Sequence, residues 1–147
     1  MSSIFNEKKL AEWGERIGRG VGTPVFIGLR GPLGAGKSVL ARAIARGAGV
    51  RATMPSPTFN LVLRYDCRDG GTVLHVDLFR LTDPDEVWEL GWSELGEPGE
   101  IALVEWPERA GELLPPARWD IRLEPVEDPL LRRVSATAVG NPPGLPE

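Results

Sequence analysis

The octapeptide Gly31-Pro32-Leu33-Gly34-Ala35-Gly36-Lys37-Ser38 constrains this chain more than any other feature. It matches the phosphate-binding pattern G-x-x-x-x-G-K-[S/T] in full. An apolar run at 25–29 precedes it, and an alanine-rich segment at 39–48 follows it. A buried strand, a glycine-rich turn and a helix in this order predict a phosphate-binding loop (P-loop) that opens an α/β unit.

The P-loop predicts the chemistry of its ligand. Lys37 is expected to reach the β- and γ-phosphates of a nucleotide, and the Ser38 hydroxyl to ligate Mg²⁺. No asparagine is followed by lysine, so the guanine-specific pattern Asn-Lys-x-Asp is missing and ATP is the expected nucleotide. The expected nucleotide-binding residues are Leu33, Gly34, Ala35, Gly36, Lys37, Ser38 and Val39.

Two apolar runs end in acids that compete for a second magnesium contact. One run ends at Asp77 and the other at Glu105, and together they indicate one acid on the metal and one on the attacking water. The four apolar residues before Glu105 match a metal-holding strand better, but which acid is the main ligand stays open. His75, two residues before Asp77, is interpreted as a packed or hydrogen-bonded residue rather than a catalyst. Thr58, in a loop with two prolines, could order the nucleophilic water, or could be an ordinary loop residue.

The rest of the chain reads as one α/β domain with a mixed parallel and antiparallel sheet, the three-layer P-loop NTPase class. A single domain is expected over 1–139, followed by a Pro/Gly-rich tail at 140–147 that is expected to be disordered. Helices are predicted at 6–20, 39–48, 83–92 and 107–114, and strands at 25–29, 60–65, 72–78, 101–104, 118–125 and 131–139. Gly18 is expected to help end the first helix.

Composition and charge limit the partners. The net charge of −4 and the isoelectric point near 5.1 argue against a bulk nucleic-acid binder. Between Asp83 and Glu112 stand ten acidic residues and one basic residue, Arg109, which is either a solvated face or a surface for a partner. One cysteine and no apolar run of membrane-spanning length lead us to expect a cytoplasmic protein without a membrane segment.

An ordered set of motifs resembles the bacterial TsaE (YjeE-like) P-loop ATPases of tRNA threonylcarbamoyladenosine biosynthesis, over roughly residues 5–139. Besides the P-loop, the set comprises Ser-Pro-Thr-Phe at 56–59, His-Val-Asp-Leu-Phe-Arg at 75–80 and Val-Glu-Trp-Pro-Glu at 104–108. The resemblance implies ATP hydrolysis with Mg²⁺ in support of the partner proteins TsaB and TsaD. It implies contact with tRNA only indirectly, through that complex.

The resemblance also implies roles for single residues. Lys37 and Ser38 would bind phosphate and Mg²⁺, Glu105 would be a second metal contact, and Asp77 would act near the γ-phosphate. Thr58 matches a switch-like threonine. Trp106 matches a tryptophan beside the active acid, and Arg132 a basic residue near the nucleotide, although Arg133 could be the aligned residue.

Departures from the family pattern are Pro32 in the P-loop, Phe79 where tyrosine is common and Leu10 where threonine is frequent. Two other functions use the same P-loop. One is a small-molecule kinase, which phosphate transfer to an added acceptor would reveal. The other is a nucleotide-regulated binding module, which would bind ATP without any partner stimulating its hydrolysis.

Overall fold

The computed structural model describes residues 2–51, 62–67, 70–90, 92 and 95–146. Seven strands form one sheet in the order β1-β7-β6-β2-β5-β4-β3. Their bounds are β1 (Ser2–Asn6), β2 (Val25–Arg30), β3 (Val62–Asp66), β4 (Thr72–Asp77), β5 (Glu100–Glu105), β6 (Arg118–Pro125) and β7 (Leu131–Val139). The helices are α1 (Glu7–Gly20), α2 (Lys37–Gly47) and the 3-10 helices η1 (Pro84–Leu90) and η3 (Pro107–Leu113).

The centre of the sheet is parallel and its edges are antiparallel. Strand β2 pairs in parallel with β5 and β6, and β4 pairs in parallel with β5. The pairs β1–β7, β6–β7 and β3–β4 are antiparallel. Every residue of β5 is buried, as expected of a strand covered on both faces. The predicted α/β class with a mixed sheet is therefore confirmed.

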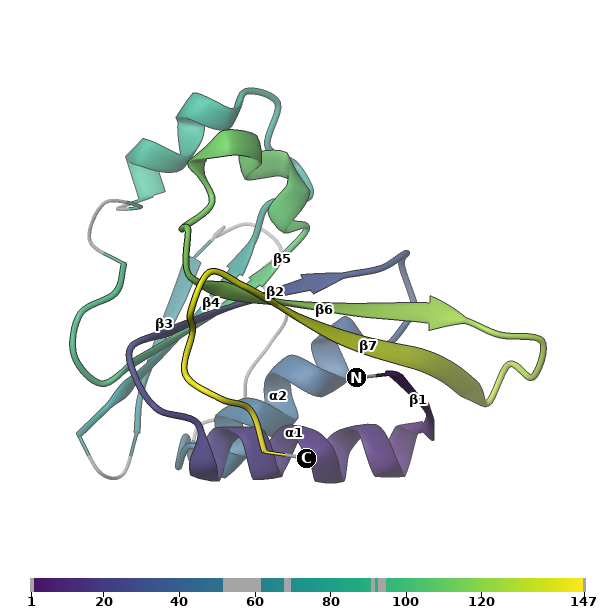
Figure 1. Cartoon of the computed structure of the whole chain (residues 1–147). Helices are drawn as coiled ribbons and strands as arrows, with labels where there is room; N and C mark the ends of the chain where they lie inside the picture. The colour runs from purple at the N-terminus through teal and green to yellow at the C-terminus, as the bar shows by residue number, and fades with distance from the viewer. Residues whose placement is uncertain (1, 52–61, 68–69, 91, 93–94, 147) are drawn as a thin grey trace.

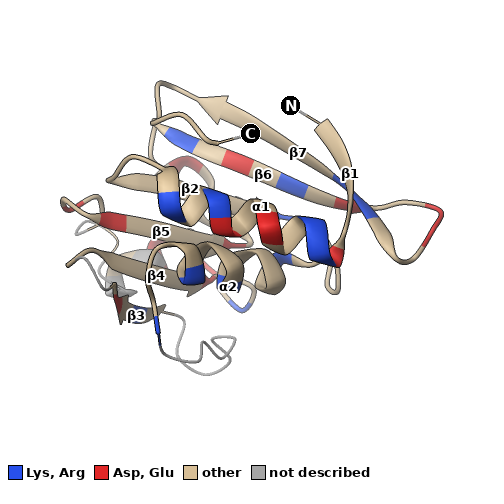
Figure 2. Cartoon of the chain, turned by 90° about the horizontal axis from the view of Figure 1, so that it is seen from below, with Lys and Arg blue, Asp and Glu red and all other residues tan. Residues whose placement is uncertain are grey.

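Helices α1 and α2 cover one face of the sheet, and η1 and η3 lie on the other (Figure 1). Two hydrophobic clusters correspond to these layers. The larger one joins α1 and α2 to the sheet, with Trp13, Ile17 and Leu40 buried in it. The smaller one lies under η1 and η3 and contains Phe26 and Trp92. Charged residues of α1 face outward (Figure 2), which completes its amphipathic pattern.

Several predicted elements differ from the structure. The segments predicted as helices at 83–92 and 107–114 are helical, but as the 3-10 helices η1 and η3 with somewhat shorter bounds, and strand β1 was not predicted. Gly18 does not end α1, which continues to Gly20. An added Cβ at Gly18 would overlap the Ile44 carbonyl oxygen, so this glycine serves the close approach of α1 to α2.

The Pro/Gly-rich tail packs against the domain, whereas its composition predicts disorder. The indole N–H of Trp119 donates to the Pro143 carbonyl at 2.7 Å, and that of Trp13 donates to the Pro146 carbonyl at 3.1 Å. Leu145 packs against the larger core cluster. The buried indole of Trp13 and the half-buried indole of Trp119 thereby obtain hydrogen-bond acceptors from the tail.

None of the helices in the described ranges is both long enough and apolar enough to cross a membrane.

Candidate nucleotide-binding site

The P-loop connects the carboxyl end of β2 to the amino end of α2. Gly36 occupies the cap position before α2 with φ of 108°, a left-handed value that favours glycine. An added Cβ at Gly31 (φ 145°) would overlap the Leu123 carbonyl oxygen of β6. Helix α2 begins at Lys37, two residues earlier than predicted, so Lys37 and Ser38 lie in its first turn. This turn carries the partial positive charge of a helix amino terminus.

Lys37 is almost completely buried, with 4% of its surface exposed. Its ammonium donates to the Gly31 carbonyl oxygen at 2.6 Å and lies 3.5 Å from the centroid of the Trp106 ring. Burial lowers the pKa of Lys37, and the carboxylates of Glu105, Glu108 and Asp77 act in the opposite direction. The cation thus lies in a partly desolvated site, where its attraction for an anionic ligand is stronger than it would be in water.

The two candidate acids face each other in the sheet. Asp77 ends β4 and Glu105 ends β5, and the two residues are direct partners in the parallel register. Asp77 Oδ1 accepts a hydrogen bond from the Phe79 N–H at 2.9 Å. Burial raises the pKa of Asp77, and the charge of Glu105 adds to this effect, while the Phe79 hydrogen bond opposes it. The structure therefore places both carboxylates at the carboxyl-terminal end of the parallel strands, where the P-loop also begins.

Glu105 also contacts the single histidine of the chain. Nε2 of His75 lies 2.6 Å from Oε2 of Glu105, and the exposed fractions of the two side chains are 1% and 6%. The contact is diagonal across β4 and β5, because His75 pairs in register with Leu103. The interpretation of His75 as a packed or hydrogen-bonded residue agrees with its burial and with this contact, but it did not identify Glu105 as the partner. The two-residue spacing of His75 and Asp77, which puts both on one strand face, is the sequence signal for it.

An aromatic pair lies beside Lys37. Trp106 has φ of 59°, which is uncommon for a residue other than glycine. This turn brings its ring over the Lys37 ammonium, and the Phe79 ring lies 5.0 Å from it. The Arg109 guanidinium lies 5.8 Å from the Phe79 ring centroid. The motif comparison paired Trp106 with the neighbouring acid, but sequence spacing could not show its contact with the lysine.

Arg132 lies on the P-loop side of β7. It shares a strand face with Val134, which is buried in the cluster under α1 and α2. A Cβ added to Gly36 would be 3.9 Å from Cζ of Arg132. Nε and Nη1 of this guanidinium are buried and have no hydrogen-bond partner among the described residues. Arg133 is exposed, is the register partner of Glu124 and lies on the other face of β7 from Arg132. Of the two arginines, Arg132 is therefore the one beside the loop.

A cavity of about 230 Å³ lies over the P-loop, and Glu105 faces it from the sheet. It is lined by Leu33, Gly34, Gly36, Lys37, Ser38, Val39 and Glu105. Ala35, also expected to bind nucleotide, is buried against the core beneath the loop. Thr58 lies outside the described residues. The structure thus brings together most of the predicted residues around one cavity.

The donor set of this cavity suits Mg²⁺. A hydroxyl, that of Ser38, and a carboxylate, that of Glu105, both line it, and oxygen atoms are the ligands that Mg²⁺ prefers. Within the described ranges, no group of three or more His, Cys, Asp or Glu side chains could hold a metal ion. Magnesium in nucleotide sites needs only one or two protein ligands, because phosphates and water complete its shell.

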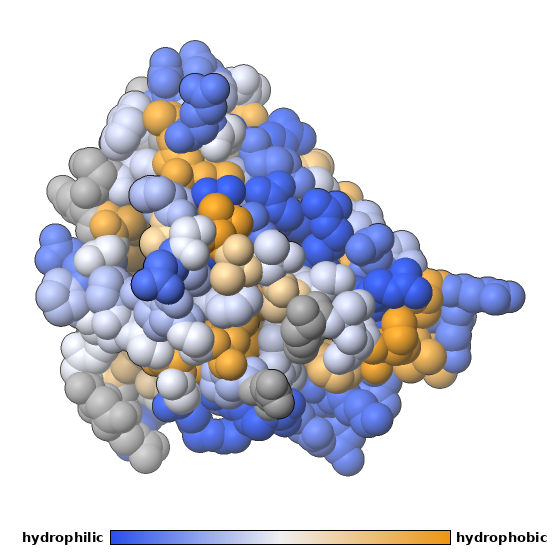
Figure 3. Space-filling model, viewed as in Figure 1, coloured by the Kyte–Doolittle hydropathy of each residue, from blue (hydrophilic) through white to orange (hydrophobic). Residues whose placement is uncertain are grey.

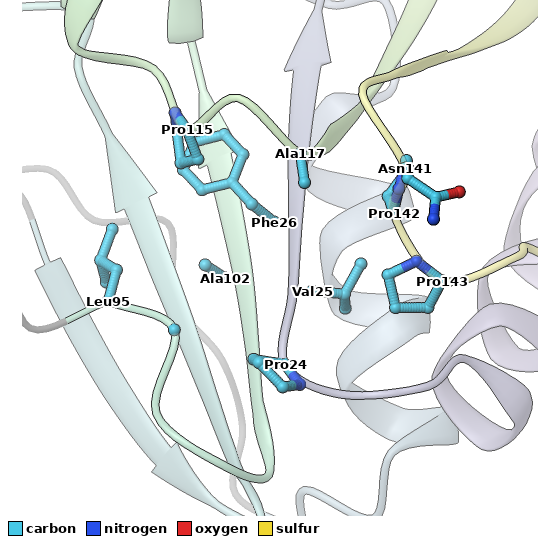
Figure 4. Close-up of a pocket in the computed structure, with 11 residues that line it drawn as sticks. Pro24, Val25, Phe26, Leu95, Ala102, Pro115, Ala117, Asn141, Pro142 and Pro143 are labelled. Carbon is cyan, nitrogen blue, oxygen red and sulfur yellow. The ribbon is translucent and has the colours of Figure 1, made fainter.

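A second cavity, of about 290 Å³, has a different character. Figure 4 shows it between the C-terminal tail and the amino ends of β2 and β6, with Pro24, Val25 and Ala117 at its wall. Apolar side chains and prolines dominate its lining, and none of the described residues that line it is charged. It therefore lacks the groups that a phosphate ligand requires.

Comparisons with known proteins agree with this geometry. The family model described as "Threonylcarbamoyl adenosine biosynthesis protein TsaE" matches residues 4–134. The chain is 35% identical over 104 residues to the tRNA threonylcarbamoyladenosine biosynthesis protein TsaE of Haemophilus influenzae, a match that covers 71% of this chain and 65% of that protein. It is 39% identical over 120 residues to the protein of the same name from Mycobacterium tuberculosis, covering 77% and 71%.

Among solved structures, the crystal structure of Bacillus subtilis YdiB is similar, with a TM-score of 0.74 and 25% sequence identity. The match covers 95% of this chain and 86% of that one. The aligned part of this chain spans slightly less than two thirds of the Haemophilus influenzae relative.

Proposed function

Because this chain belongs to the TsaE family of tRNA threonylcarbamoyladenosine biosynthesis, we propose that it is an ATPase whose hydrolysis of Mg-ATP supports that modification of tRNA. One observation carries the proposal. A buried lysine, the amino end of a helix and two register-paired carboxylates meet at the carboxyl-terminal end of the parallel strands. This is the arrangement that phosphoryl transfer to water requires, a cation for the phosphates, oxygen ligands for a metal and an acid for the water.

Each side chain has a proposed role. Phosphate oxygens would replace the Gly31 carbonyl as the partner of the Lys37 ammonium. Ser38 and Glu105 would hold Mg²⁺, which when bound draws electron density from the β- and γ-phosphates. Asp77 would orient the attacking water, and Arg132 would supply a second cation beside Gly36. Thr58, outside the described residues, stays a predicted contact for that water.

We propose that hydrolysis is slow in the isolated protein and is stimulated by the partners TsaB and TsaD, with tRNA reached only through their complex. The acidic segment supports a partner surface. Five of its acids are exposed among the described residues, namely Asp83, Asp85, Glu97, Glu108 and Glu112. Others have structural partners instead, since Glu100 is buried beside Arg64 and Glu86 accepts from Thr82. Figure 3 shows hydrophilic residues at the tip that η1 and η3 form.

The direct test is the rate of ATP hydrolysis with and without the TsaB–TsaD pair, at saturating ATP and low salt. We expect stimulation of about tenfold or more if the partners supply a catalytic group in trans. Added salt should weaken it as the Debye length falls below about 10 Å, because the acidic surface is exposed. Equal rates with and without partners would contradict the proposal. Phosphate transfer to an added acceptor would identify a kinase instead.

The partner surface can be tested separately from the nucleotide site. The double charge reversal Asp85→Lys and Glu112→Lys alters two exposed acids that do not line the cavity over the P-loop. We expect it to reduce the stimulation by partners and to leave basal ATP binding unchanged. A matched control reverses Glu15→Lys on α1, far along the chain from the acidic segment. Equal loss of stimulation in both variants would argue against a localised acidic surface.

A further inference from the structure

His75 makes a buried polar contact with Glu105 at the candidate site. Its Nε2 lies 2.6 Å from Oε2 of Glu105, and both side chains are almost fully buried. Nδ1 is also buried and has no hydrogen-bond partner among the described residues. Because a carboxylate oxygen only accepts hydrogen bonds, the contact requires a proton on Nε2, which donates to Glu105.

This contact distinguishes the two carboxylate oxygens of Glu105. Oε2 is engaged by the imidazole, while the side chain lines the cavity over the P-loop. Oε1 is then the oxygen left for a cation beside Ser38. A glutamate has three rotatable side-chain bonds, so a hydrogen bond that fixes one oxygen also fixes the direction of the other.

Without this contact, Glu105 would have a competing partner. The Lys37 ammonium lines the same cavity, and the Glu105 charge already acts on its pKa. In the structure Lys37 instead donates to the Gly31 carbonyl and contacts the Trp106 ring. A carboxylate released from His75 could turn towards the ammonium, which would occupy both the metal ligand and the phosphate-binding cation.

We propose that His75 is a positioning residue, whose Nε2–H holds the Glu105 carboxylate so that its second oxygen faces the magnesium position of the P-loop. The inference rests on the proposed function, since it concerns the metal of the same site. Hydrogen bonds to metal-binding groups commonly change metal affinity by about 10- to 100-fold. His75 therefore acts through Glu105 and is not expected to contact the nucleotide.

Two substitutions separate this role from simple packing. In His75→Gln, the amide nitrogen stands the same number of bonds from Cα as Nε2 and can donate to Glu105. In His75→Asn, the amide is one bond shorter and does not reach. The measurement is the dissociation constant of ATP by calorimetry, with Mg²⁺ and with EDTA, and the quantity compared is the ratio of the two constants. Thermal unfolding reports whether each variant is folded.

We expect His75→Asn to reduce the gain in ATP affinity from Mg²⁺ by about tenfold or more, with the value in EDTA unchanged within about twofold. His75→Gln should restore most of the gain. In a Glu105→Gln background, His75→Asn should have little further effect, because the two residues act as one unit. If the asparagine variant does not fold, His75→Phe, which keeps a planar ring without a donor, takes its place.

Three results would overturn the role of His75. They are an unchanged magnesium effect in His75→Asn, a defect in His75→Gln as large as in His75→Asn, and an undiminished effect of His75→Asn in the Glu105→Gln background. Failure of the proposed function looks different. In that case the parent protein itself binds ATP equally well with Mg²⁺ and with EDTA, before any variant is compared.

Discussion

Lys37 shows how much of a site a motif can predict and where it stops. The P-loop pattern predicts the lysine, its loop and the helix that follows, and the structure has all three. The pattern does not predict that the ammonium rests on the Trp106 ring and the Gly31 carbonyl. That contact depends on a left-handed turn at Trp106, which lies in a different part of the chain and has no local sequence signal.

We expect Lys37→Ala to abolish productive ATP binding and leave the fold intact. Loss of a charged hydrogen-bond donor in a desolvated site should cost about 2–3 kcal/mol, or roughly 30- to 150-fold in affinity. Calorimetry measures the affinity, and thermal unfolding checks the fold. Arg46→Ala is the control, because Arg46 is exposed in the same helix and pairs with Glu15. Parent-like ATP binding in Lys37→Ala would mean that the loop is not a nucleotide site.

Asp77 carries a prediction about pH. Because burial raises its pKa above the ordinary value of 3.8, folding takes up protons between the two values. The free energy of unfolding therefore falls as pH rises through that window, and the cost of the ionised carboxylate remains above it. We expect Asp77→Asn to unfold at a higher temperature than the parent at neutral pH. The gain should vanish as the pH falls well below the ordinary value of 3.8, where both states of the parent are protonated.

Calorimetric unfolding of the nucleotide-free protein across this pH range measures the effect. The same variant should bind Mg-ATP almost normally and hydrolyse it poorly, because the carboxylate that we propose to orient the water is gone. A variant that is less stable than the parent at neutral pH would show that the Asp77 hydrogen bond with Phe79 outweighs the cost of burying its charge.

At the scale of elements, helix periodicity predicted the position of α1, but glycine was misread within it. Gly18 has poor helix propensity, and by that measure it should end the helix. In the structure Gly18 faces the Ile44 carbonyl and Gly47 faces the Glu15 carbonyl, so both glycines lie in the contact between α1 and α2. A contact between distant segments cannot be seen in a local pattern, which is why propensity alone gave the wrong role.

Gly18→Ala tests this role. In an unpacked helix, alanine for glycine stabilises by about 0.5–1 kcal/mol. Here the new Cβ would overlap backbone of α2, so we expect the free energy of unfolding to fall by about 1–3 kcal/mol. Gly20→Ala is the control, since its Cβ would meet only the Pro146 side chain at 3.2 Å. Chemical denaturation measures both, and stabilisation by Gly18→Ala would contradict the packing argument.

Strands were easier to predict than the short helices. A short continuous apolar run is typical of a strand that is buried on both faces. The run that forms β5 has this pattern, and every residue of the strand is buried in the structure. The segments that became η1 and η3 contain capping signals such as Asp83 and Pro107, but each is only one or two turns long. Such segments lack the length that makes an α-helix cooperative, so packing against the sheet decides their geometry.

At the scale of the molecule, the tail closes over α1 and β6 instead of remaining free. Its composition gave the opposite expectation, because prolines and glycines weaken regular structure without preventing contact. The tail is held by hydrogen bonds from other parts of the chain, namely from the indole N–H groups of Trp13 and Trp119. Trp13 and Trp119 lie far apart in the sequence, so no local sequence pattern indicates that both contact the tail.

Deletion of residues 141–147 should therefore destabilise the protein. Two indole N–H groups would lose their acceptors, which we expect to cost about 2 kcal/mol or more in free energy of unfolding. Denaturation curves of the shortened and full-length chains measure the difference. The control replaces Asn141 and Gly144 by serine, leaving the chain length and both carbonyl acceptors in place. A shortened chain as stable as the parent would indicate that the tail is only loosely associated.

The strand order has a consequence for the synthesis of the protein on the ribosome. Strand β2 carries the P-loop, but its two neighbours, β5 and β6, are synthesised much later. About 75 residues separate Ile27 from its partner Leu103, which at a synthesis rate of 5–20 residues per second means roughly 4–15 seconds. During that interval a strand with five buried positions has no sheet to join. The nascent chain thus presents an unpaired apolar segment, and the end of the sheet that carries the candidate site forms only after β5 and β6 have been synthesised.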